Sequence, residues 1–169
     1  MSSPSPTLSP TGPRSPVIRV FDCHICRPRD GGLEFLLLRR AANKVYAGTW
    51  RMVGGKLKPD ETAWQACLRE IAEETQLRVR RLITVPYVNR FYEWQHDRIN
   101  DIPVFLAVTD SGAEPILDEE HTEAVWVSSQ QANDLLPWPA QREGLLAAEA
   151  MLLGSSSLIE FLEVEIPVS

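Results

Sequence analysis

Long hydrophobic runs are missing from this chain of 169 residues. Its longest apolar stretches, such as EFLLLRR and GLLAAEAMLLG, are far shorter than the roughly 20 residues that a membrane-spanning helix needs, and no apolar signal region opens the sequence. We therefore expect a cytoplasmic protein without a membrane partner. The hydrophobic content of 44% still allows a sizeable core, and the length favours one compact domain.

Cysteine is scarce as well, with three residues in the chain. The stretch CHIC, from Cys23 to Cys26, has the spacing of half a zinc site or of a redox motif. A tetrahedral zinc site needs four ligands, however, and only Cys67 and two scattered histidines remain to complete one. We interpret Cys23 and Cys26 as packing residues of an early strand and its end.

Positive charge is also in short supply, because the net charge is −6. This balance argues against binding to a nucleic acid polymer. The charge is unevenly distributed along the sequence. Residues up to Lys58 include ten Lys or Arg and three Asp or Glu, whereas residues from Pro59 onward include seven Lys or Arg and twenty Asp or Glu. Such a division suits a protein that holds a small polyanion and a divalent cation, although chance asymmetry of a solvated surface gives the same pattern. We expect a monomer or homodimer.

The first sixteen residues contain five Pro and five Ser, too little apolar surface to offset the entropy of ordering, so we predict a disordered tail over residues 1–16 and a domain over 17–169. Alternating or continuous apolar residues predict strands, and residues 62–76, 128–136 and 139–154 have helical patterns. The predicted fold is α+β, a mixed sheet flanked by helices. The predicted strands are residues 17–23, 33–40, 50–55, 77–94, 99–110 and 124–128.

The helix predicted to begin at Thr62 carries three closely spaced glutamates. Thr62 and Gln65 have the spacing of a capping box, with Asp60 as a competing cap. On a helical wheel the apolar arc contains Trp64, Cys67, Leu68 and Ile71. Glu74 falls at the edge of this arc and Glu70 and Glu73 extend it outward, whereas Gln65, Arg69 and Gln76 fall on the face that should be most exposed.

Carboxylates at the border of a packed face repel each other more strongly than carboxylates in water. A divalent cation that takes several carboxylate oxygens at once would relieve this repulsion, and Mg²⁺ is commonly held by a few carboxylates together with substrate phosphates. A solvated run of charges is the alternative interpretation of the EXXEE pattern, and the residues that precede it argue for the metal site.

From Gly55 the sequence reads Gly, five residues, Glu61, seven residues, and then Arg69 to Leu77 as REIAEETQL. This stretch of 23 residues resembles the Nudix box, the signature of the Nudix hydrolases, and departs from it only at Gln76, where the family usually has Gly. Because Gly at that position normally adopts a left-handed conformation, we expect a slightly different helix end here.

The resemblance implies an α/β/α sandwich that hydrolyses a nucleoside diphosphate linked to another moiety with Mg²⁺ or Mn²⁺. It implies Glu70, Glu73 and Glu74 as metal ligands, with Arg69 and Glu61 supporting their orientation. Gly55 would let the backbone approach the metal and the pyrophosphate. An acidic residue in a later loop often completes the metal shell in this family, and we choose Glu120 over Glu119 and Glu123.

The candidates for the general base are Glu73 and Glu120, with His121 as a third. Arg39 and Arg40 end a strand that should point toward the phosphates. The aromatic residues that could stack on a base or pterin are Tyr46, Trp50, Phe91, Tyr92 and Trp94, each of which could instead serve ordinary packing.

Glu120-His121, a following Trp126 and the stretch LPWPAQREGLLAAEAM also resemble the dihydroneopterin triphosphate pyrophosphatase branch. The products would then be a monophosphate and pyrophosphate. Two other classes remain open: a Nudix-type module that binds a nucleotide without hydrolysing it, and an interaction module recruited through the Pro/Ser-rich tail. The full set of acidic residues argues against the first, because a binder does not need it.

Overall fold

The computed structural model describes residues 17–154 and 159–167, so the predicted disordered tail lies outside the described part. The predicted strands and helices occur in the predicted order, with two differences: the segment predicted as one strand over 50–55 forms two strands, and the short strand Glu163–Val164 was not predicted. Two short 3-10 helices lie at Trp94–His96 and Ile159–Leu162. The strands are β1 (Val20–Arg29), β2 (Gly32–Arg40), β3 (Trp50–Arg51), β4 (Val53–Lys56), β5 (Arg81–Glu93), β6 (Arg98–Val108), β7 (His121–Val127) and β8 (Glu163–Val164). The helices are α1 (Ala63–Thr75), α2 (Ser129–Leu135) and α3 (Pro139–Leu153).

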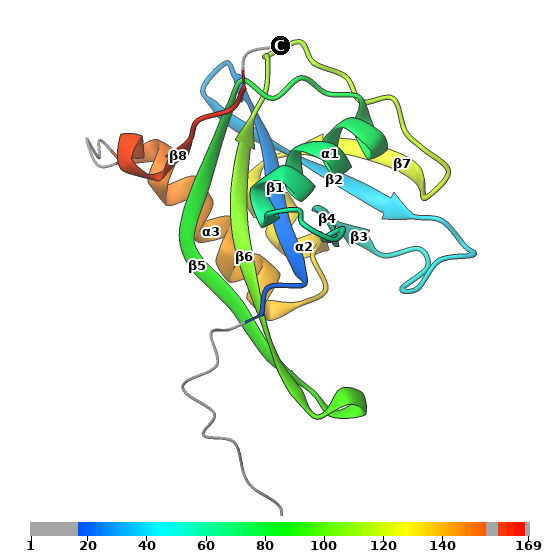
Figure 1. The fold of residues 1–169 in the computed structure, drawn as a ribbon. Helices are drawn as coiled ribbons and strands as arrows, with labels where there is room; N and C mark the ends of the chain where they lie inside the picture. Colours follow the sequence, from blue (N-terminus) through cyan, green and yellow to red (C-terminus); the bar gives the residue numbers. More distant parts are fainter. Residues whose placement is uncertain (1–16, 155–158, 168–169) are drawn as a thin grey trace, which may run out of the picture.

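One mixed sheet of eight strands forms the middle layer. The strand order is β3-β2-β1-β6-β5-β8, β4 pairs with β1, and β7 pairs with β2. The β1–β6 pair is parallel, whereas the β1–β2 and β5–β6 pairs are antiparallel hairpins. Helix α1 covers one face, and α2 and α3 lie across the other (Figure 1). This arrangement confirms the predicted α/β/α sandwich.

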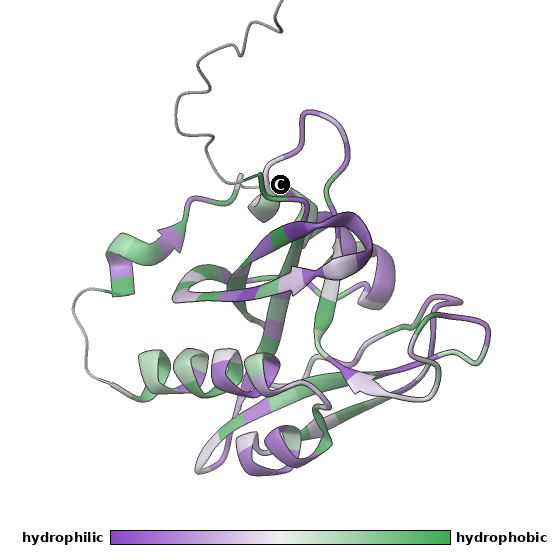
Figure 2. Cartoon of the chain, turned by 90° about the horizontal axis from the view of Figure 1, so that it is seen from below, coloured by the Kyte–Doolittle hydropathy of each residue, from purple (hydrophilic) through white to green (hydrophobic). Residues whose placement is uncertain are grey.

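Alternation along β1 divides the core between the two faces. Phe21, Cys23 and Ile25 pack in the cluster under α1, and Cys26 packs in the cluster under α2 and α3. Hydrophobic residues recur along α3 and the central strands (Figure 2). All three cysteines are free and buried, which confirms their packing role. No described helix is both long and apolar enough to cross a membrane.

Helix α1 begins with the predicted capping box. The Thr62 side chain accepts a hydrogen bond from the Gln65 backbone N–H, and the Gln65 side chain accepts one from the Thr62 backbone N–H. These bonds satisfy two of the N–H groups that a helix start leaves without partners. Thr62 is therefore the N-cap, and Asp60 stays in the preceding loop. The cap fixes where the glutamates of α1 stand relative to the β4–α1 loop.

The end of α1 corrects our expectation for Gln76. This residue adopts the left-handed conformation, with φ 55° and ψ 16°, and its N–H donates to the Ala72 carbonyl. The turn is thus the one that Gly would make, with an exposed side chain and the cap hydrogen bond formed. A residue with a Cβ pays about 1 kcal/mol for this conformation.

Gln76→Gly is therefore expected to raise the free energy of unfolding by up to about 1 kcal/mol, since Gly removes the left-handed strain and its extra freedom in the unfolded chain offsets only part of the gain. Urea denaturation measures this change. Ala72→Gly, at an exposed position inside the same helix, is the matched control and should lower the free energy by about 1 kcal/mol. A loss of stability in both variants would contradict the argument.

His24 is a buried titratable group on the other face of the sheet. A Cβ placed on Gly144 of α3 would lie 3.5 Å from its Nε2, which has no hydrogen-bond partner among the described residues. Burial lowers the pKa of His24 from 6.5 to about 4. The unfolded chain therefore takes up a proton at a higher pH than the folded protein does, and stability is lost as the pH falls from 6.5 toward 4.

We expect this proton uptake to remove roughly 3 kcal/mol from the free energy of unfolding across that pH window. His24→Asn should flatten this part of the pH profile, whatever it does to stability at pH 7.5. Urea denaturation of both proteins between pH 7.5 and pH 4.5 gives the difference between the profiles, which isolates His24 from the other titrating groups. Parallel profiles would show that His24 does not carry the effect.

Candidate active site

The β4–α1 loop brings the start of the glutamate motif against the sheet. The Lys58 backbone N–H donates to Glu61 Oε2 at 2.8 Å, and the Glu61 N–H donates to the Lys58 carbonyl at 3.2 Å, so the loop closes on itself. A Cβ added to Gly55 would lie 2.7 Å from side-chain atoms of Glu70, closer than real contacts allow. Gly55 is thus required for the close approach of β4 to Glu70, and not for a positive φ.

Arg69 joins three of the predicted site carboxylates. Its Nε and Nη2 donate to the two oxygens of Glu61 at 2.8 and 2.9 Å, and Nη1 donates to Glu70 at 2.7 Å and to Glu73 at 3.1 Å. Nη2 also donates to the Lys56 carbonyl at 3.1 Å. Hydrogen bonds from Arg69 lower the pKa of Glu61 to about 2. The arginine therefore holds the loop, the helix and the carboxylates in one arrangement.

This position of Arg69 corrects the helical wheel. We expected Arg69 on the most exposed face of α1, but only 19% of its side chain is exposed. The wheel describes an isolated helix, and the β4–α1 loop folds over this side and supplies Glu61. Glu73 is the most exposed of the three glutamates, at 52% of its side chain, and lies 3.6 Å from Lys58 Nζ.

Glu74 is the buried member of the motif, as its place at the edge of the apolar arc predicts. Its exposed fraction is 5%, and its Oε2 has no hydrogen-bond partner among the described residues. The pKa of Glu74 is raised to about 8, mainly by burial and also by the negative charges of Glu70, Asp118 and Glu120, against the opposing effect of Arg51. A buried carboxylate oxygen without a partner, among further acids, is a place where a cation would be stabilising.

Glu120 lies in the loop between β6 and β7 and is fixed by two cations. Its carboxylate accepts hydrogen bonds from Arg40 at 2.8 Å and from Lys44 at 2.9 Å, which lower its pKa to about 2. The neighbouring His121 Nδ1 lies 3.1 Å from Asp118 Oδ1, and its ring is buried. Burial lowers the pKa of His121, and Asp118 opposes this effect from its contact with the ring at the start of β7.

The sequence did not reveal two charged residues, Arg51, which acts on Glu74, and Asp22, which acts on Arg51. Arg51 of β3 acts on both Asp22 and Glu74, and burial together with Arg40 lowers its pKa. Asp22 is buried on β1, accepts a hydrogen bond from Asn89 at 3.2 Å, and has a pKa that burial raises. The available signals were a basic residue just before the two glycines and an acidic residue inside an apolar strand.

The predicted substrate residues fall into two groups. Arg39 Nη1 donates to Glu123 at 2.6 Å, and its guanidinium lies 5.9 Å from the centroid of the half-buried Trp50 ring. Tyr46 has a positive φ of 61°, is exposed, and meets Trp138 edge to face at 5.7 Å. These residues surround the β2–β3 connection and share that region with Arg40.

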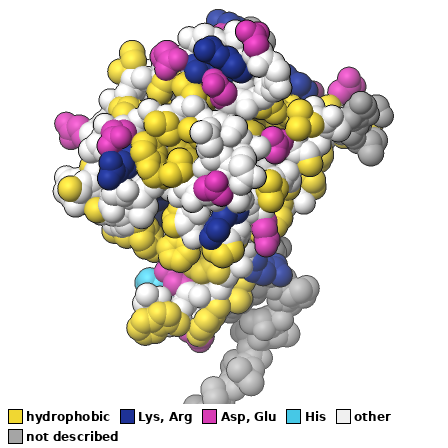
Figure 3. Space-filling view, turned by 180° about the vertical axis from the view of Figure 1, so that it is seen from behind, with side chains coloured by type: hydrophobic (Ala, Val, Ile, Leu, Met, Phe, Trp, Pro, Cys, Tyr) yellow, Lys and Arg dark blue, Asp and Glu magenta, His cyan; other side chains and the backbone are white. Residues whose placement is uncertain are grey.

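The other three aromatic candidates lie elsewhere. Phe91, Tyr92 and Trp94 are exposed and lie toward the end of the long β5–β6 hairpin, which projects from the body of the molecule (Figure 1). Figure 3 shows hydrophobic side chains gathered on this projection, seen from behind. The structure thus separates them from Tyr46 and Trp50.

The four predicted metal ligands differ in their surroundings. Glu70 and Glu73 contact Arg69, Glu120 contacts Arg40 and Lys44, and Glu74 remains unpartnered at Oε2. Within residues 17–154 and 159–167, no three acidic, histidine or cysteine side chains already stand at metal-binding distances. The oxygen-rich donor set, the orphaned oxygen of Glu74 and the close fit of Gly55 against Glu70 nevertheless suit a hard divalent cation.

Comparison with known proteins supplies the family. The sequence profile of the NUDIX domain matches residues 18–148 of the chain. The chain belongs to the NUDIX family. This assignment confirms the resemblance seen in the box from Gly55 to Leu77, and extends it over most of the chain.

Among the curated proteins similar to this chain, an octanoyltransferase from Myxococcus xanthus is 29% identical over 137 residues, which are 80% of this chain and 38% of that protein. A CTP pyrophosphohydrolase from Escherichia coli is 48% identical over 46 residues, which are 27% of this chain and 33% of that protein. The matches therefore span little more than a third of either relative.

Solved NUDIX structures share the fold. An Ap4A hydrolase from C. elegans has a TM-score of 0.68 at 23% identity, and covers 82% of this chain and 99% of its own. The E. coli dihydroneopterin triphosphate pyrophosphohydrolase has a TM-score of 0.62 at 21% identity, and covers 80% of this chain and 99% of its own. At these identities the likeness establishes the architecture.

Proposed function

We propose that this NUDIX chain is a metal-dependent pyrophosphohydrolase. Its substrate would be a nucleoside diphosphate linked to another moiety, such as a nucleoside triphosphate or a compound like dihydroneopterin triphosphate, cleaved to a monophosphate and pyrophosphate. The observation that carries the proposal is the buried, unpartnered oxygen of Glu74 within the glutamate motif of α1. The pyrophosphohydrolase name of the E. coli relative agrees with this reaction.

The cation would be Mg²⁺ or Mn²⁺, held by Glu70, Glu73, Glu74 and Glu120. When bound, it would offset negative charge on the phosphoryl oxygens and make water a better nucleophile. Arg69 positions Glu70 and Glu73 through Nη1 and ties both to Glu61. These bonds keep the carboxylates oriented toward one region before the substrate arrives, which lowers the cost of assembling the site.

Glu73 is the stronger candidate for the general base. The two bonds from Arg40 and Lys44 lower the pKa of Glu120 to about 2, so this carboxylate is a poor proton acceptor. Glu73 is the most exposed of the three α1 glutamates and can reach water. We assign Glu120 to metal binding, and Arg39, Arg40, Tyr46 and Trp50 to substrate binding around the β2–β3 connection.

The reaction is tested on a panel of compounds, with Mg²⁺ and with EDTA, by separating the products on an ion-exchange column and measuring the monophosphates and pyrophosphate formed. The panel holds nucleoside triphosphates including CTP, dihydroneopterin triphosphate, nucleotide sugars and dinucleoside polyphosphates. A pyrophosphohydrolase should turn over at least one class, and only with the cation. An absence of turnover across the whole panel would overturn the proposal and favour a nucleotide-binding module.

A further inference from the structure

A second feature lies directly beside the glutamate motif. A pocket of about 510 Å³ opens between the start of β1, the β4–α1 loop and the beginning of β6. Four basic side chains line it, Arg19, Lys56, Lys58 and Arg98, together with Asn100 and apolar groups. In a chain with a net charge of −6, four cations around one pocket form a marked local excess of positive charge.

The basic side chains of this pocket are only partly neutralised. No ion pair joins Arg19 or Lys56 to a carboxylate within residues 17–154 and 159–167, and the one hydrogen bond of the Arg19 guanidinium goes to the Val17 carbonyl at 3.4 Å. Arg98 pairs through Nε with Glu93, which leaves its other N–H groups available. The single lining carboxylate, Glu61, is already held by Arg69.

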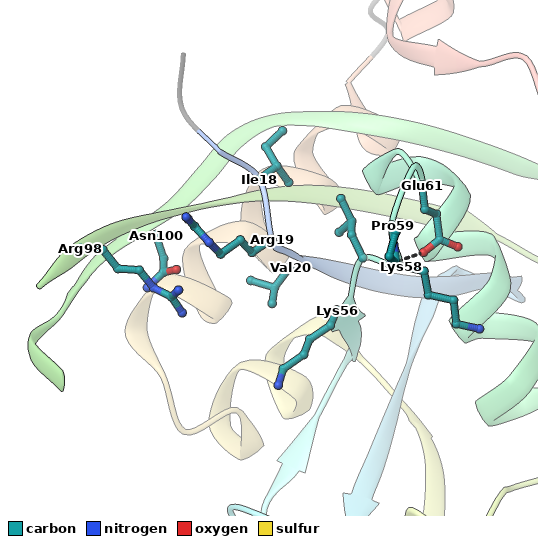
Figure 4. Close-up of a pocket in the computed structure, with 10 residues that line it drawn as sticks. Ile18, Arg19, Val20, Lys56, Lys58, Pro59, Glu61, Arg98 and Asn100 are labelled. Carbon is teal, nitrogen blue, oxygen red and sulfur yellow. Dashed lines mark hydrogen bonds between the residues drawn. The ribbon is translucent and has the colours of Figure 1, made fainter. Parts of the chain in front are cut away.

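Figure 4 shows how the basic side chains of the pocket lie. The Arg19 side chain extends toward Arg98 and Asn100, and Lys56 extends on the same side of the strands, whereas Lys58 turns away. Lys58 lies 3.6 Å from Glu73 and so belongs to the glutamate side. Arg19, Lys56 and Arg98 come from three separate segments of the chain and line the same pocket.

A contact and a hydrogen bond also connect the pocket to the proposed active site. Lys56 follows Gly55, which touches Glu70, and the Lys56 carbonyl accepts a hydrogen bond from Arg69 Nη2 at 3.1 Å. The backbone of one pocket residue is thus fixed by the arginine that orients the glutamates. Because Gly55 and Lys56 are adjacent in β4, the glutamate motif and the pocket meet at the end of this strand.

We propose that this pocket binds a phosphate group of the substrate that lies outside the bond being cleaved, an inference that rests on the proposed hydrolase function. Two guanidinium groups and an ammonium group match the charge and the several acceptor oxygens of a phosphate. The substrate class is therefore one with an additional phosphate, such as a longer polyphosphate chain, in preference to a nucleotide sugar with a neutral sugar.

Binding is tested by titrating the full chain calorimetrically with inorganic tripolyphosphate in EDTA. Without a cation the glutamates repel a polyanion. Arg39 and Arg40 are paired with Glu123 and Glu120, whereas Arg19 and Lys56 of the pocket have no ion-pair partner among the described residues, so the pocket is expected to dominate the binding. Arg19→Gln and Lys56→Gln should each weaken binding about tenfold, the usual effect of losing a charge-assisted hydrogen bond. Both side chains are at the surface, and matching urea denaturation curves verify that the variants fold.

Arg80→Gln is the matched control. Arg80 pairs with Asp110 near the opposite end of β6. Its replacement by Gln removes the same unit of charge as Arg19→Gln does. It should change the affinity less than twofold. No binding to the wild-type chain, or an equal loss in Arg80→Gln and Arg19→Gln, would overturn the proposal, because the second result indicates a general effect of net charge.

A kinetic comparison separates this inference from the proposed function. Arg19→Gln should raise KM several-fold for adenosine tetraphosphate, leave KM for an ADP-sugar unchanged, and leave kcat unchanged for both. Equal KM changes for the two substrates would overturn the proposal that the pocket binds a phosphate, and would leave the proposed hydrolase function intact. If no substrate of the panel is hydrolysed, the hydrolase fails and the tripolyphosphate titration alone decides whether the pocket binds phosphate.

Discussion

Glu74→Gln is expected to lower hydrolysis by a factor of about 10² to 10³ or more and to remove most of the affinity for a divalent cation. The substitution keeps the shape of the side chain but takes away the one α1 carboxylate that has a buried oxygen without a hydrogen-bond partner among the described residues. Since the group is buried and surrounded by further acids, it should gain more than its neighbours from a bound cation.

Two quantities are measured. One is turnover of the hydrolysed substrate, and the other is Mn²⁺ binding, which electron paramagnetic resonance detects during a titration. Glu119→Gln is the control, because Glu119 is exposed in the same loop as Glu120 and loses the same charge. It should keep both cation affinity and turnover within about twofold, as expected for a solvated acid. Full turnover in Glu74→Gln would refute the assignment of Glu74, and a preserved substrate affinity with no turnover in the wild type would identify a binding module.

The local parts of the fold were predictable from the sequence. The capping box needs only Thr62 and Gln65 three residues apart, and the two faces of β1 follow from the alternation of its side chains. The parallel pairing of β1 with β6 and the attachment of β4 to β1 were not predictable, because they depend on contacts between segments far apart in the sequence. Such pairings leave no local pattern.

The site divides in the same way. The depth of Glu74 followed from the helical period, because one helix face decides it. The wheel placed Arg69 in solvent, since it contains no information on the loop that carries Glu61 over that face. Arg51 was missed for a similar reason: its effect on Glu74 arises between β3 and α1. For Gln76 the prediction was wrong in the other direction. The family usually has Gly at this position, which suggested a different helix end here, but the backbone of Gln76 adopts the left-handed conformation that Gly would adopt.

Arg69→Lys is expected to reduce kcat by a factor of about 10 to 100 and to change KM much less. Lysine keeps the positive charge but has a single nitrogen, whereas Arg69 spreads five hydrogen bonds over Glu61, Glu70, Glu73 and the Lys56 carbonyl. One ammonium group cannot hold three carboxylates in this arrangement, so Glu70 and Glu73 should lose their orientation. Misplaced ligands affect the transition state more than the binding of substrate.

Arg80→Lys controls for the chemical change itself, because Arg80 also forms a bidentate pair, with Asp110, in an exposed position away from the glutamates. It should leave kcat unchanged. Arg69→Gln should be worse than Arg69→Lys and should also lower the free energy of unfolding, by about 1 to 3 kcal/mol, since several partners lose their donor at once. If Arg69 acted only on stability, the kcat of Arg69→Lys would equal that of the wild type at temperatures well below the unfolding midpoint of the variant. A kcat that remains low there, with the Arg80→Lys enzyme fully active, identifies Arg69 as the residue that positions the glutamates.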